Sequence, residues 1–448
     1  MTLTTTSNLI SEDYALSLID SVIKQSEAEG VFVSLSNKSE SLTRFSENQI
    51  TQNISSTKFS LNITSYFGKK SASSSTTDLD ADAIASTLRC SEELAKIAPE
   101  DPEWVPLLEP QTYEHRHPVF DEHTATISPL EIGKIVQRVC AMSAVAEVDG
   151  AGTLSTEAYV RAIGNSTGLR ACERSTEADF SFTARINDGS SWGNSTALAI
   201  NFLPVESLTE NLIERGKKSR QPSELPPGKY PVIFDVPAFG SLLGWVIWNL
   251  DARAADEGRS FMSRTDEQGK PNGNRLGEAM FSPLIQVQRD PAHPLLQSGT
   301  FFGNGLSNNY LEIIKNGVPQ NLSYSRYWAL QTGKQPTGSM YPFVMSGSDR
   351  NLADLIAETE RGVLVSRAWY VQYVNPRTLE VTGMTRDGTF WIENGEIAYP
   401  IKNFRFNQSL PQMLQNIDAI GTVQRYGSSV VPAVRVKEFN FSSITDSV

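Results

Sequence analysis

The centre of the chain reads Phe239-Gly-Ser-Leu-Leu-Gly-Trp-Val-Ile-Trp-Asn-Leu-Asp-Ala-Arg-Ala-Ala-Asp-Glu-Gly-Arg-Ser-Phe261. Its first half is strongly apolar, and large aliphatic side chains recur there at the spacing of one helical face. These side chains are Leu242, Leu243, Val246, Ile247 and Leu250. We therefore predict a core helix over residues 239–256, with its polar residues gathered towards its end.

A Pro-rich segment just before this helix is the clearest boundary in the chain. It reads Gln221-Pro-Ser-Glu-Leu-Pro-Pro-Gly228, and clustered proline with glycine favours an irregular connection. We predict an N-terminal α+β domain over 1–98 and a strand-rich C-terminal domain over 221–448. Between them, residues 99–220 form a predicted middle α+β region, a connector plus strands, that can pack with the N-terminal domain.

Periodic patterns define the elements of the first 220 residues. Helical spacing of apolar residues predicts helices over 13–29, 80–98, 130–143 and 205–218. Alternating patterns predict strands over 31–35, 40–50, 59–66, 145–148, 154–163, 169–186 and 191–201. The polar segment 68–77 predicts a turn between a strand and a helix.

Composition limits the classes of partner. The chain has 448 residues, of which 39% are hydrophobic and 20% charged, and its net charge is −12. Such a surface repels nucleic acid unless a local basic patch overrides it. The densest basic run, Arg215 to Arg220, adjoins the Pro-rich boundary and is better explained as a solvated loop. We expect no nucleic-acid partner.

The three cysteines, Cys90, Cys140 and Cys172, are widely spaced and form no metal-binding or disulfide pattern. We interpret them as reduced thiols in the cytosol. The N-terminus lacks the basic and apolar segments of a secretory signal. The longest apolar run, 242–250, is far too short to span a bilayer. The sequence therefore predicts a cytoplasmic protein without a membrane partner.

Several segments together resemble one known family. Besides 239–256, they are Gly258-Arg-Ser-Phe261, Gly362-Val-Leu-Val-Ser-Arg367, the block Val381 to Pro400, and Leu410-Pro-Gln-Met-Leu-Gln-Asn-Ile417 followed by Ala419-Ile-Gly421. They resemble the TldD/PmbA family, once called modulators of DNA gyrase. The resemblance implies an α+β fold, with a small N-terminal helix and antiparallel-sheet domain and a larger strand-rich C-terminal domain. It also implies a metallopeptidase complex that pairs a zinc-bearing subunit, TldD, with a zinc-less sister, TldE or PmbA.

The zinc motif of the family is missing here. In the zinc-bearing subunit the helix matching 239–256 carries His-Glu-x-x-x-His, whereas this segment has no histidine. Leu243, Ile247 and Asp251 stand along the degenerate helix, and no cysteine follows Cys172 to supply the C-terminal thiolate ligand. Tetrahedral zinc needs such ligands. We expect no catalytic residue and no cofactor in this chain, with zinc only in a partner subunit.

Three histidines form a weaker metal candidate. His115, His117 and His123 lie in a connector near several acidic residues. An extended His-x-His can direct both rings to one side, but Pro118 interrupts the segment and no apolar scaffold supports it. A solvated surface cluster is the better interpretation. A Ser/His/Asp triad has no favourable histidine context either.

Other polar and aromatic residues are candidates for contacts with a peptide or a partner. Aromatic residues and arginine are enriched at interfaces but also fill cores, so both roles remain open. The candidates are Asp256, Arg259, Ser260, Tyr310, Tyr327 and Trp328. The acidic Asp-x-Glu-Gly turn common in the family is replaced by Phe302-Gly-Asn-Gly305, which indicates a divergent branch.

The leading hypothesis is a non-catalytic subunit of a TldD/TldE-type cytosolic metallopeptidase complex that binds and processes peptides or unfolded segments. Its partner would be a TldD-like zinc-bearing sister in a heterodimer. One alternative is a self-standing homodimer that binds peptides or acts as a scaffold without peptidase activity. Another is a hydrolase with an unrecognised site, which would have to turn over substrate as an isolated chain.

Overall fold

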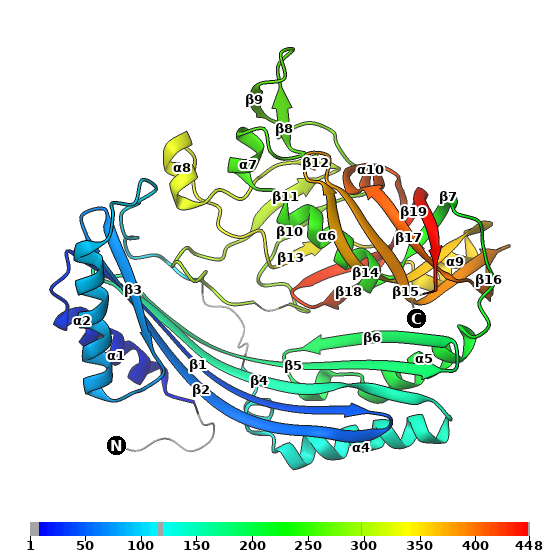
Figure 1. Ribbon diagram of the computed structural model, residues 1–448, viewed down its shortest axis with the longest axis horizontal. Coiled ribbons are helices and arrows are strands. Elements are labelled where there is room, and N and C mark those ends of the chain that lie inside the picture. Colours follow the sequence, from blue (N-terminus) through cyan, green and yellow to red (C-terminus); the bar gives the residue numbers. More distant parts are fainter. Residues whose placement is uncertain (1–8, 115–119, 297, 447–448) are drawn as a thin grey trace.

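The computed structural model of the chain describes residues 9–114, 120–296 and 298–446. A long, curved antiparallel sheet forms one layer, and a strand-rich body lies over one of its faces (Figure 1). The strands of this sheet run in the order β3-β2-β1-β4-β5-β6. They are β1 (Gly30–Ser46), β2 (Gln49–Phe67), β3 (Lys70–Thr76), β4 (Asp149–Asn165), β5 (Arg170–Ile186) and β6 (Gly189–Ala197).

Helices cover one face of this sheet because its strands alternate apolar and polar side chains. In β1, Val31, Val33 and Leu35 are buried, whereas Ser34 and Ser36 between them are only partly buried and face the other way. Towards one end of the sheet the apolar face packs on α1 and α2, and towards the other end on α4 and α5 (Figure 1). The helices of this region are α1 (Glu12–Gln25), α2 (Ala81–Ile97), α3 (Glu122–Thr126), α4 (Pro129–Val145), the 3-10 turn η1 (Ile200–Phe202) and α5 (Val205–Lys218).

The N-terminal and middle regions share this one sheet. Strand β1 pairs with β4 along most of its length, from Phe32 opposite Asn165 to Phe45 opposite Gly152. The strands on the two sides of the predicted boundary at residue 98 are therefore joined by a continuous ladder. The division of the chain into three domains stays a prediction.

The second sheet is mixed and forms the core of the C-terminal region. Its main path runs β12-β11-β10-β13-β19-β17-β15-β14-β7, with β16 beside β15 and β18 beside β19. The strands are β7 (Gly228–Phe234), β10 (Val287–Arg289), β11 (Leu311–Lys315), β12 (Val318–Pro319), β13 (Phe343–Met345), β14 (Arg361–Asn375), β15 (Glu380–Glu393), β16 (Glu396–Pro400), β17 (Asn403–Ser409), β18 (Ile417–Tyr426) and β19 (Ser429–Thr445). The pairs β7–β14 and β13–β19 are parallel.

Short helices and a small hairpin complete this region. The helices are α6 (Val236–Trp248), α7 (Ala252–Asp256), α8 (Arg326–Thr332), α9 (Leu352–Ala357) and α10 (Leu410–Gln415), and the hairpin pairs β8 (Ser263–Thr265) with β9 (Pro271–Asn274). The predicted α+β fold is thereby confirmed. Among the described residues, no helix combines the length and the apolar character needed to cross a membrane.

Three predicted local elements in the first 220 residues were wrong. The predicted strand over 145–148 begins at the last residue of α4 and continues through a turn in which Glu147 has positive φ. Residues 68–77, predicted as a turn, contain strand β3. The predicted strand over 40–50 contains the β1–β2 turn, where Glu47 and Asn48 both have positive φ. Strand β3 was missed because its polar residues give no pattern of their own and its structure depends on pairing with β2. The β1–β2 turn was missed because no glycine marks it.

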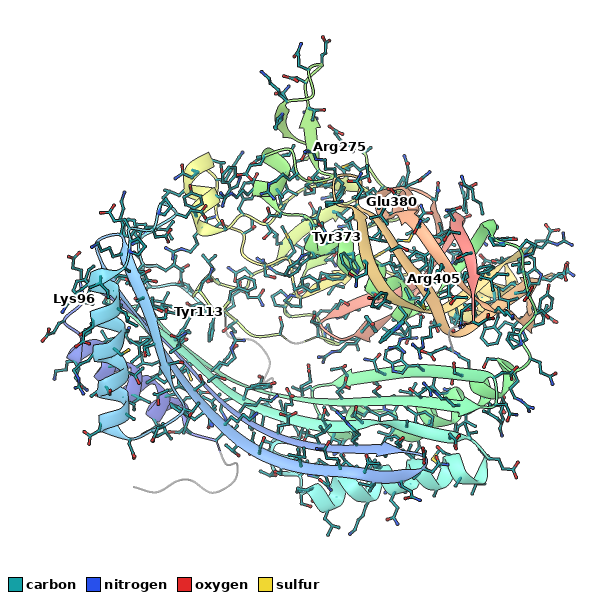
Figure 2. The ribbon with its side chains drawn as sticks, viewed as in Figure 1. Lys96, Tyr113, Arg275, Tyr373, Glu380 and Arg405 are labelled. Carbon is teal, nitrogen blue, oxygen red and sulfur yellow. The ribbon has the colours of Figure 1, made fainter. Side chains whose placement is uncertain are left out.

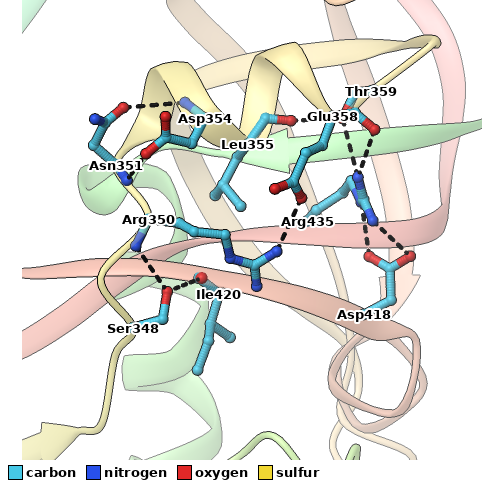
Figure 3. A network of polar contacts seen from close by, with 10 residues as sticks. All are labelled: Ser348, Arg350, Asn351, Asp354, Leu355, Glu358, Thr359, Asp418, Ile420 and Arg435. Carbon is cyan, nitrogen blue, oxygen red and sulfur yellow. Dashed lines mark hydrogen bonds and ion pairs between the residues drawn. The ribbon is translucent and has the colours of Figure 1, made fainter.

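A polar network fixes the position of strand β18, which contributes to the candidate site (Figure 3). Arg435 of β19 donates from Nε to Asp418 of β18 at 2.9 Å and from Nη1 to the carbonyl of Glu358 at 3.0 Å. Arg350 reaches the Glu358 carboxylate at 2.9 Å. Helix α9, between Arg350 and Glu358, is thus held against β18 and β19.

Candidate functional site

Helix α6 starts directly after strand β7. Asp235 caps the helix by accepting a hydrogen bond from the Val236 amide at 2.8 Å, and Pro237 lies in the first turn. Arg215 of α5 forms an ion pair with the same carboxylate at 3.2 Å. The start of α6 is therefore fixed both to the second sheet and to a helix of the first region.

The predicted single helix over 239–256 was wrong, because polar residues divide it. Asn249 ends α6, and its side-chain amide donates back to the Trp245 carbonyl at 2.8 Å. Asp251 then caps α7 by accepting from the Ala254 amide at 2.7 Å. At this break, the Leu250 carbonyl accepts a hydrogen bond from the Ser323 amide, and the Ala252 amide donates to the Ser323 carbonyl. Asparagine and aspartate favour caps over helix interiors, which accounts for the break.

The two faces of α6 differ sharply. Leu243 and Ile247, the degenerate positions on the predicted zinc helix, are buried in the core. Gly240, Gly244 and Trp248 share another face at four-residue spacing and border an open groove. The Trp248 side chain is 72% exposed. Small and aromatic residues of α6 thus form most of its contact with the groove, whereas Leu243 does not border it.

This α6 groove consists of two adjoining hollows of about 550 and 820 Å³, which share Trp248, Tyr341 and Tyr373. The first is also lined by Gly240, Ser241, Gly244, Trp245, Phe343, Tyr426, Gly427, Ser428 and Ser429. The second is also lined by Ile247, Asn249, Asp251, Ala254, Arg259, Ser260, Ser323, Ser339, Met340, Pro376 and Arg377.

The aromatic walls of the groove are held by hydrogen bonds and ring packing. The Trp245 and Tyr373 rings meet edge to face at 4.6 Å, and the Tyr373 hydroxyl donates to Asn249 Oδ1 at 2.9 Å (Tyr373 is labelled in Figure 2). The Tyr341 hydroxyl donates to the Gly244 carbonyl at 2.8 Å. Burial raises the pKa of Tyr341 to about 12, so the phenol stays protonated near neutral pH. The walls are therefore preorganised, neutral and largely aromatic.

Two glycines allow this close packing. A Cβ atom added at Gly240 would lie 2.7 Å from Tyr426 Cδ1, and one at Gly244 would lie 3.1 Å from the Tyr341 hydroxyl. A side chain at Gly240 would therefore displace the Tyr426 ring, and one at Gly244 would push against the Tyr341 hydroxyl. Besides these glycines, Ser241, Trp245 and Trp248 form the α6 side of the first hollow.

The second hollow is more polar. Arg259 lies at its rim with Nη2 and Nε both bonded to Glu257, while the Ser260 hydroxyl accepts from the Met262 amide at 3.1 Å. Asp251 borders the same hollow while it caps α7. Four residues singled out from the sequence therefore line one end of the groove, namely Ile247, Asp251, Arg259 and Ser260.

The remaining candidates lie elsewhere. Trp328 of α8 donates from Nε1 to Asp256 of α7 at 2.8 Å, and Arg253 lies 5.5 Å from the Trp328 ring and 5.6 Å from the Tyr327 ring. This cluster joins α7 to α8. Tyr310 is exposed just before β11 and lines neither hollow of the groove.

An acidic row lies on the face of the long sheet that looks towards the C-terminal region. Glu40, Glu157 and Glu177 stand directly opposite one another on β1, β4 and β5. Lys38 binds Glu157 at 2.6 Å and Glu40 at 3.2 Å, and Arg425 of β18 binds Glu177. Burial raises the pKa of Glu177, although Arg425 opposes the shift. The row is thus balanced by cations from both regions.

A smaller hollow of about 240 Å³ lies where β6 and α5 meet β15 to β17. Its polar side chains bond one another: Thr389 donates to Asn403 at 2.8 Å, and Lys402 binds Asp446 at 3.0 Å and Glu224 at 2.9 Å. Because these groups already satisfy one another, the α6 groove is the stronger candidate site.

The predicted histidine cluster lies largely outside the described residues. His115 and His117 lie outside the described residues, and His123 is exposed on α3. Within the described ranges, no three His, Cys, Asp or Glu side chains are grouped so that they could hold a metal ion. Helix α6 itself contains no His, Cys, Asp or Glu, so its residues do not fit a zinc ion of the kind expected in the zinc-bearing subunit of the family.

The groove includes residues that the sequence did not single out. Tyr341, Tyr373 and Tyr426 come from segments far from α6 in the chain, and no local pattern connects them to it. One signal was present, the Gly240-Gly244-Trp248 spacing, because small residues at four-residue intervals permit close packing against a helix face.

Comparisons with known proteins agree with this architecture. A family model described as the PmbA/TldA metallopeptidase C-terminal domain matches residues 227–443, and one described as PmbA/TldA metallopeptidase domain 1 matches residues 31–95. The metalloprotease PmbA of Escherichia coli O157:H7 is 24% identical over 379 residues, which cover 81% of this chain and 80% of that protein. A metalloprotease of Methanothermobacter thermautotrophicus is 23% identical over 235 residues, 50% of this chain and 49% of that protein.

Solved structures share the fold over nearly the whole chain. A candidate modulator of DNA gyrase from Bacteroides thetaiotaomicron has a TM-score of 0.84 at 20% identity, covering 97% of this chain and 100% of that one. TldE from Thermococcus kodakarensis has a TM-score of 0.82 at 17% identity, covering 96% and 99%. Taken with the two matching domain models, these likenesses show that the chain belongs to the TldD/PmbA family, whose domains are described as metallopeptidase domains.

Proposed function

We propose that this chain is a non-catalytic subunit of a cytosolic TldD/TldE-type metallopeptidase complex. In this role it pairs with a TldD-like, zinc-bearing sister and helps to hold the peptide or unfolded segment that the sister cleaves. The chain itself supplies no zinc ligand and no catalytic residue. The proposal rests on the α6 groove and on membership of a metallopeptidase family.

One observation carries the proposal. The groove-facing side of α6 presents Gly240, Gly244 and Trp248, and none of these residues is a usual zinc ligand. The chain has only four histidines, and no two of them have the spacing of a helical zinc motif. In the proposed role, the zinc chemistry of the family comes from the sister chain.

The groove suits contact with a polypeptide. Exposed tryptophan beside tyrosine supplies a large apolar contact area with few rotatable bonds, which is typical of residues that dominate protein interfaces. Arg259 and Arg377 border the same groove and add donors for backbone carbonyls or a carboxylate. Such a surface recognises peptide without cleaving it.

The test combines the purified chain with its zinc-bearing sister. Complex size is measured by light scattering, and cleavage of an unstructured peptide is followed with each subunit alone as a control. We expect cleavage only from the mixture, and no cleavage when the zinc ligands of the sister are substituted. A matched mixture that contains the Trp248→Ala variant should form less complex or cleave the peptide more slowly.

Two outcomes would contradict the proposal. A chain that ignores the sister and associates only with itself would favour a self-standing homodimeric scaffold. Cleavage by this chain alone in the presence of a chelator would instead indicate a hydrolase with its own site.

A further inference from the structure

Strand β2 has a long unpaired edge. It pairs with β1 along its whole length, but β3 covers its other side only from Leu61 to Phe67. Within the ranges that the structure describes, no segment pairs with that side over residues 49–60. An edge strand directs alternate N–H and C=O groups outward, where they can bond to another strand.

This open edge, residues 49–60 of β2, is accessible and apolar in part. Ile50 is 42% and Ile54 is 41% exposed, and Leu130 at the start of α4 is 68% exposed. Leu130 lies beside the edge, because Asn53 donates from Nδ2 to the carbonyl of the preceding Pro129 at 3.0 Å. Large aliphatic side chains are therefore available on and next to a row of free backbone groups.

The open edge is also rigidly held. At the β1–β2 turn, Asn48 Oδ1 accepts from the Gly150 amide and Asn48 Nδ2 donates to the Val148 carbonyl, both at 2.8 Å. These bonds fix the turn to the start of β4. The β-bulge at Arg44/Phe45 leaves Thr51 of β2 without a paired residue on β1, near the start of the open edge. The edge beyond the bulge is thus a preformed template for a further strand.

Apart from this bulge, the usual protection of a sheet edge is missing from Gln49 to Thr57. Proteins commonly block edges with proline, lysine or other charges, but no proline or charged residue occurs from Gln49 to Thr57. Opposite charges flank this uncharged segment, with Glu47 before it and Lys58 after it. Two such edges placed antiparallel about a two-fold axis bring Glu47 of each copy towards Lys58 of the other.

We propose that the open edge of β2 pairs with the same edge of a second copy of this chain. The antiparallel pairing joins two six-stranded sheets into one continuous sheet, with the exposed isoleucines near the axis. An isologous contact of this kind needs a self-complementary surface, which the Glu47 and Lys58 charges provide. With a net charge of −12 on each chain, an uncharged edge is also where two copies approach with little repulsion.

The pairing is independent of the proposed peptidase role. In Figure 1, β2 lies along the outer margin of the long sheet, whereas α6 lies in the C-terminal body. Association through β2 therefore leaves the α6 groove open to a peptide or a sister subunit.

The first experiment measures self-association of the full chain by sedimentation velocity over a concentration series. Gln52→Lys with Ile54→Lys places like charges on the exposed edge and should raise the dimer dissociation constant at least about tenfold. Asn201→Lys with Asn211→Lys makes the same charge change at exposed positions in η1 and α5. This control should leave the dimer dissociation constant nearly unchanged. Circular dichroism verifies that each variant is folded.

A charge exchange then tests the antiparallel arrangement. Glu47→Lys and Lys58→Glu should each weaken the dimer severalfold, and the double exchange should restore it. A chain that stays monomeric throughout the series overturns the proposal, as does a dimer insensitive to the edge lysines. If the edge lysines weaken binding of the sister but not self-association, the edge belongs to the sister instead.

Discussion

Arg367 of β14 donates from Nη1 to Asp387 Oδ2 of β15 at 2.7 Å, and the rings of Trp192 and Trp369 flank its guanidinium at 3.9 and 4.2 Å. Trp192 belongs to β6 of the long sheet, so this stack crosses between the two regions of the molecule. Ser190, also on β6, donates to the other carboxylate oxygen of Asp387 at 3.0 Å. A buried carboxylate and a stacked arginine thereby fasten the long sheet to the C-terminal body.

Arg367→Ala should destabilise this junction strongly. It leaves the buried Asp387 carboxylate without its closest cation and removes the packing between two tryptophans, a loss of about 3 kcal/mol. Urea unfolding followed by tryptophan fluorescence measures the effect, because Trp192 and Trp369 report on the junction itself. Arg361→Ala is the matched control: its pair with Glu393 is exposed and should contribute less than about 1 kcal/mol. Equal losses for the two variants would refute the role of the stack.

Gly240→Ala should destabilise the chain although alanine favours helices. At an unconstrained helical position the change stabilises by about 0.5–1 kcal/mol. Here the new Cβ would lie 2.7 Å from Tyr426 and 3.2 Å from Val431, so we expect a loss of about 1–3 kcal/mol from overpacking. Gly303→Ala, with no atom within 4 Å of its new Cβ, should change the free energy of unfolding little. A stabilised Gly240→Ala variant would show that Tyr426 moves away freely.

The predictable parts of the fold are the helices and strands whose apolar residues lie on one face only. Helix α5 spans Val205–Lys218, as predicted, because it buries one apolar stripe and exposes its charged residues. The β1–β2 hairpin was missed because its turn places Glu47 and Asn48 at positive φ without the glycine that usually marks such a turn. Strand β3 is mostly serine, and its structure depends on pairing with β2, which its own residues do not indicate.

The candidate site was predictable only in part, for a geometric reason. The sequence located the right segment, since α6 and the cap of α7 border the groove. It also assigned the buried face correctly, because Leu242, Leu243, Val246, Ile247 and Leu250 are all buried. It did not indicate that Gly240, Gly244 and Trp248 border a groove, because tryptophan in an apolar segment is usually a core residue. The tyrosines that complete the groove arrive from β14, from β18 and from the segment before β13, so only the tertiary fold brings them together.

The carboxyl of Asp179 should make stability depend on pH. Burial raises its pKa above the ordinary value of 3.8, and Glu157 adds to the shift, while Thr196 and Arg425 oppose it. The folded chain therefore holds this proton more tightly than the unfolded chain, and ionisation costs stability as the pH rises above 3.8. Asp179→Asn removes that cost while its side-chain oxygen can still accept from Thr196.

The expected result is a difference between variant and unsubstituted chain that grows with pH. The free energy of unfolding of Asp179→Asn, relative to that of the unsubstituted chain, should be larger at pH 7 than at pH 4. Urea unfolding at both pH values measures this difference. Asp149→Asn, at an exposed position at the start of β4, controls for the loss of one negative charge. A variant whose difference is the same at both pH values would exclude burial of the Asp179 charge as a cost.

Trp248→Ala should separate binding from folding. The side chain is 72% exposed, so its removal costs little of the core, yet it is shared by both hollows of the groove. If the groove holds a peptide or the sister, loss of this aromatic contact should weaken binding by about 2 kcal/mol, or roughly thirtyfold. Fluorescence anisotropy with a labelled unstructured peptide, and titration with the sister, measure the two affinities.

Phe202→Ala is the control, because Phe202 is 71% exposed but lies beside α5, away from the groove. If both variants bind equally well, the α6 groove is not the contact surface. If Trp248→Ala loses the sister but keeps the peptide, the groove is part of the subunit interface and peptide binds elsewhere.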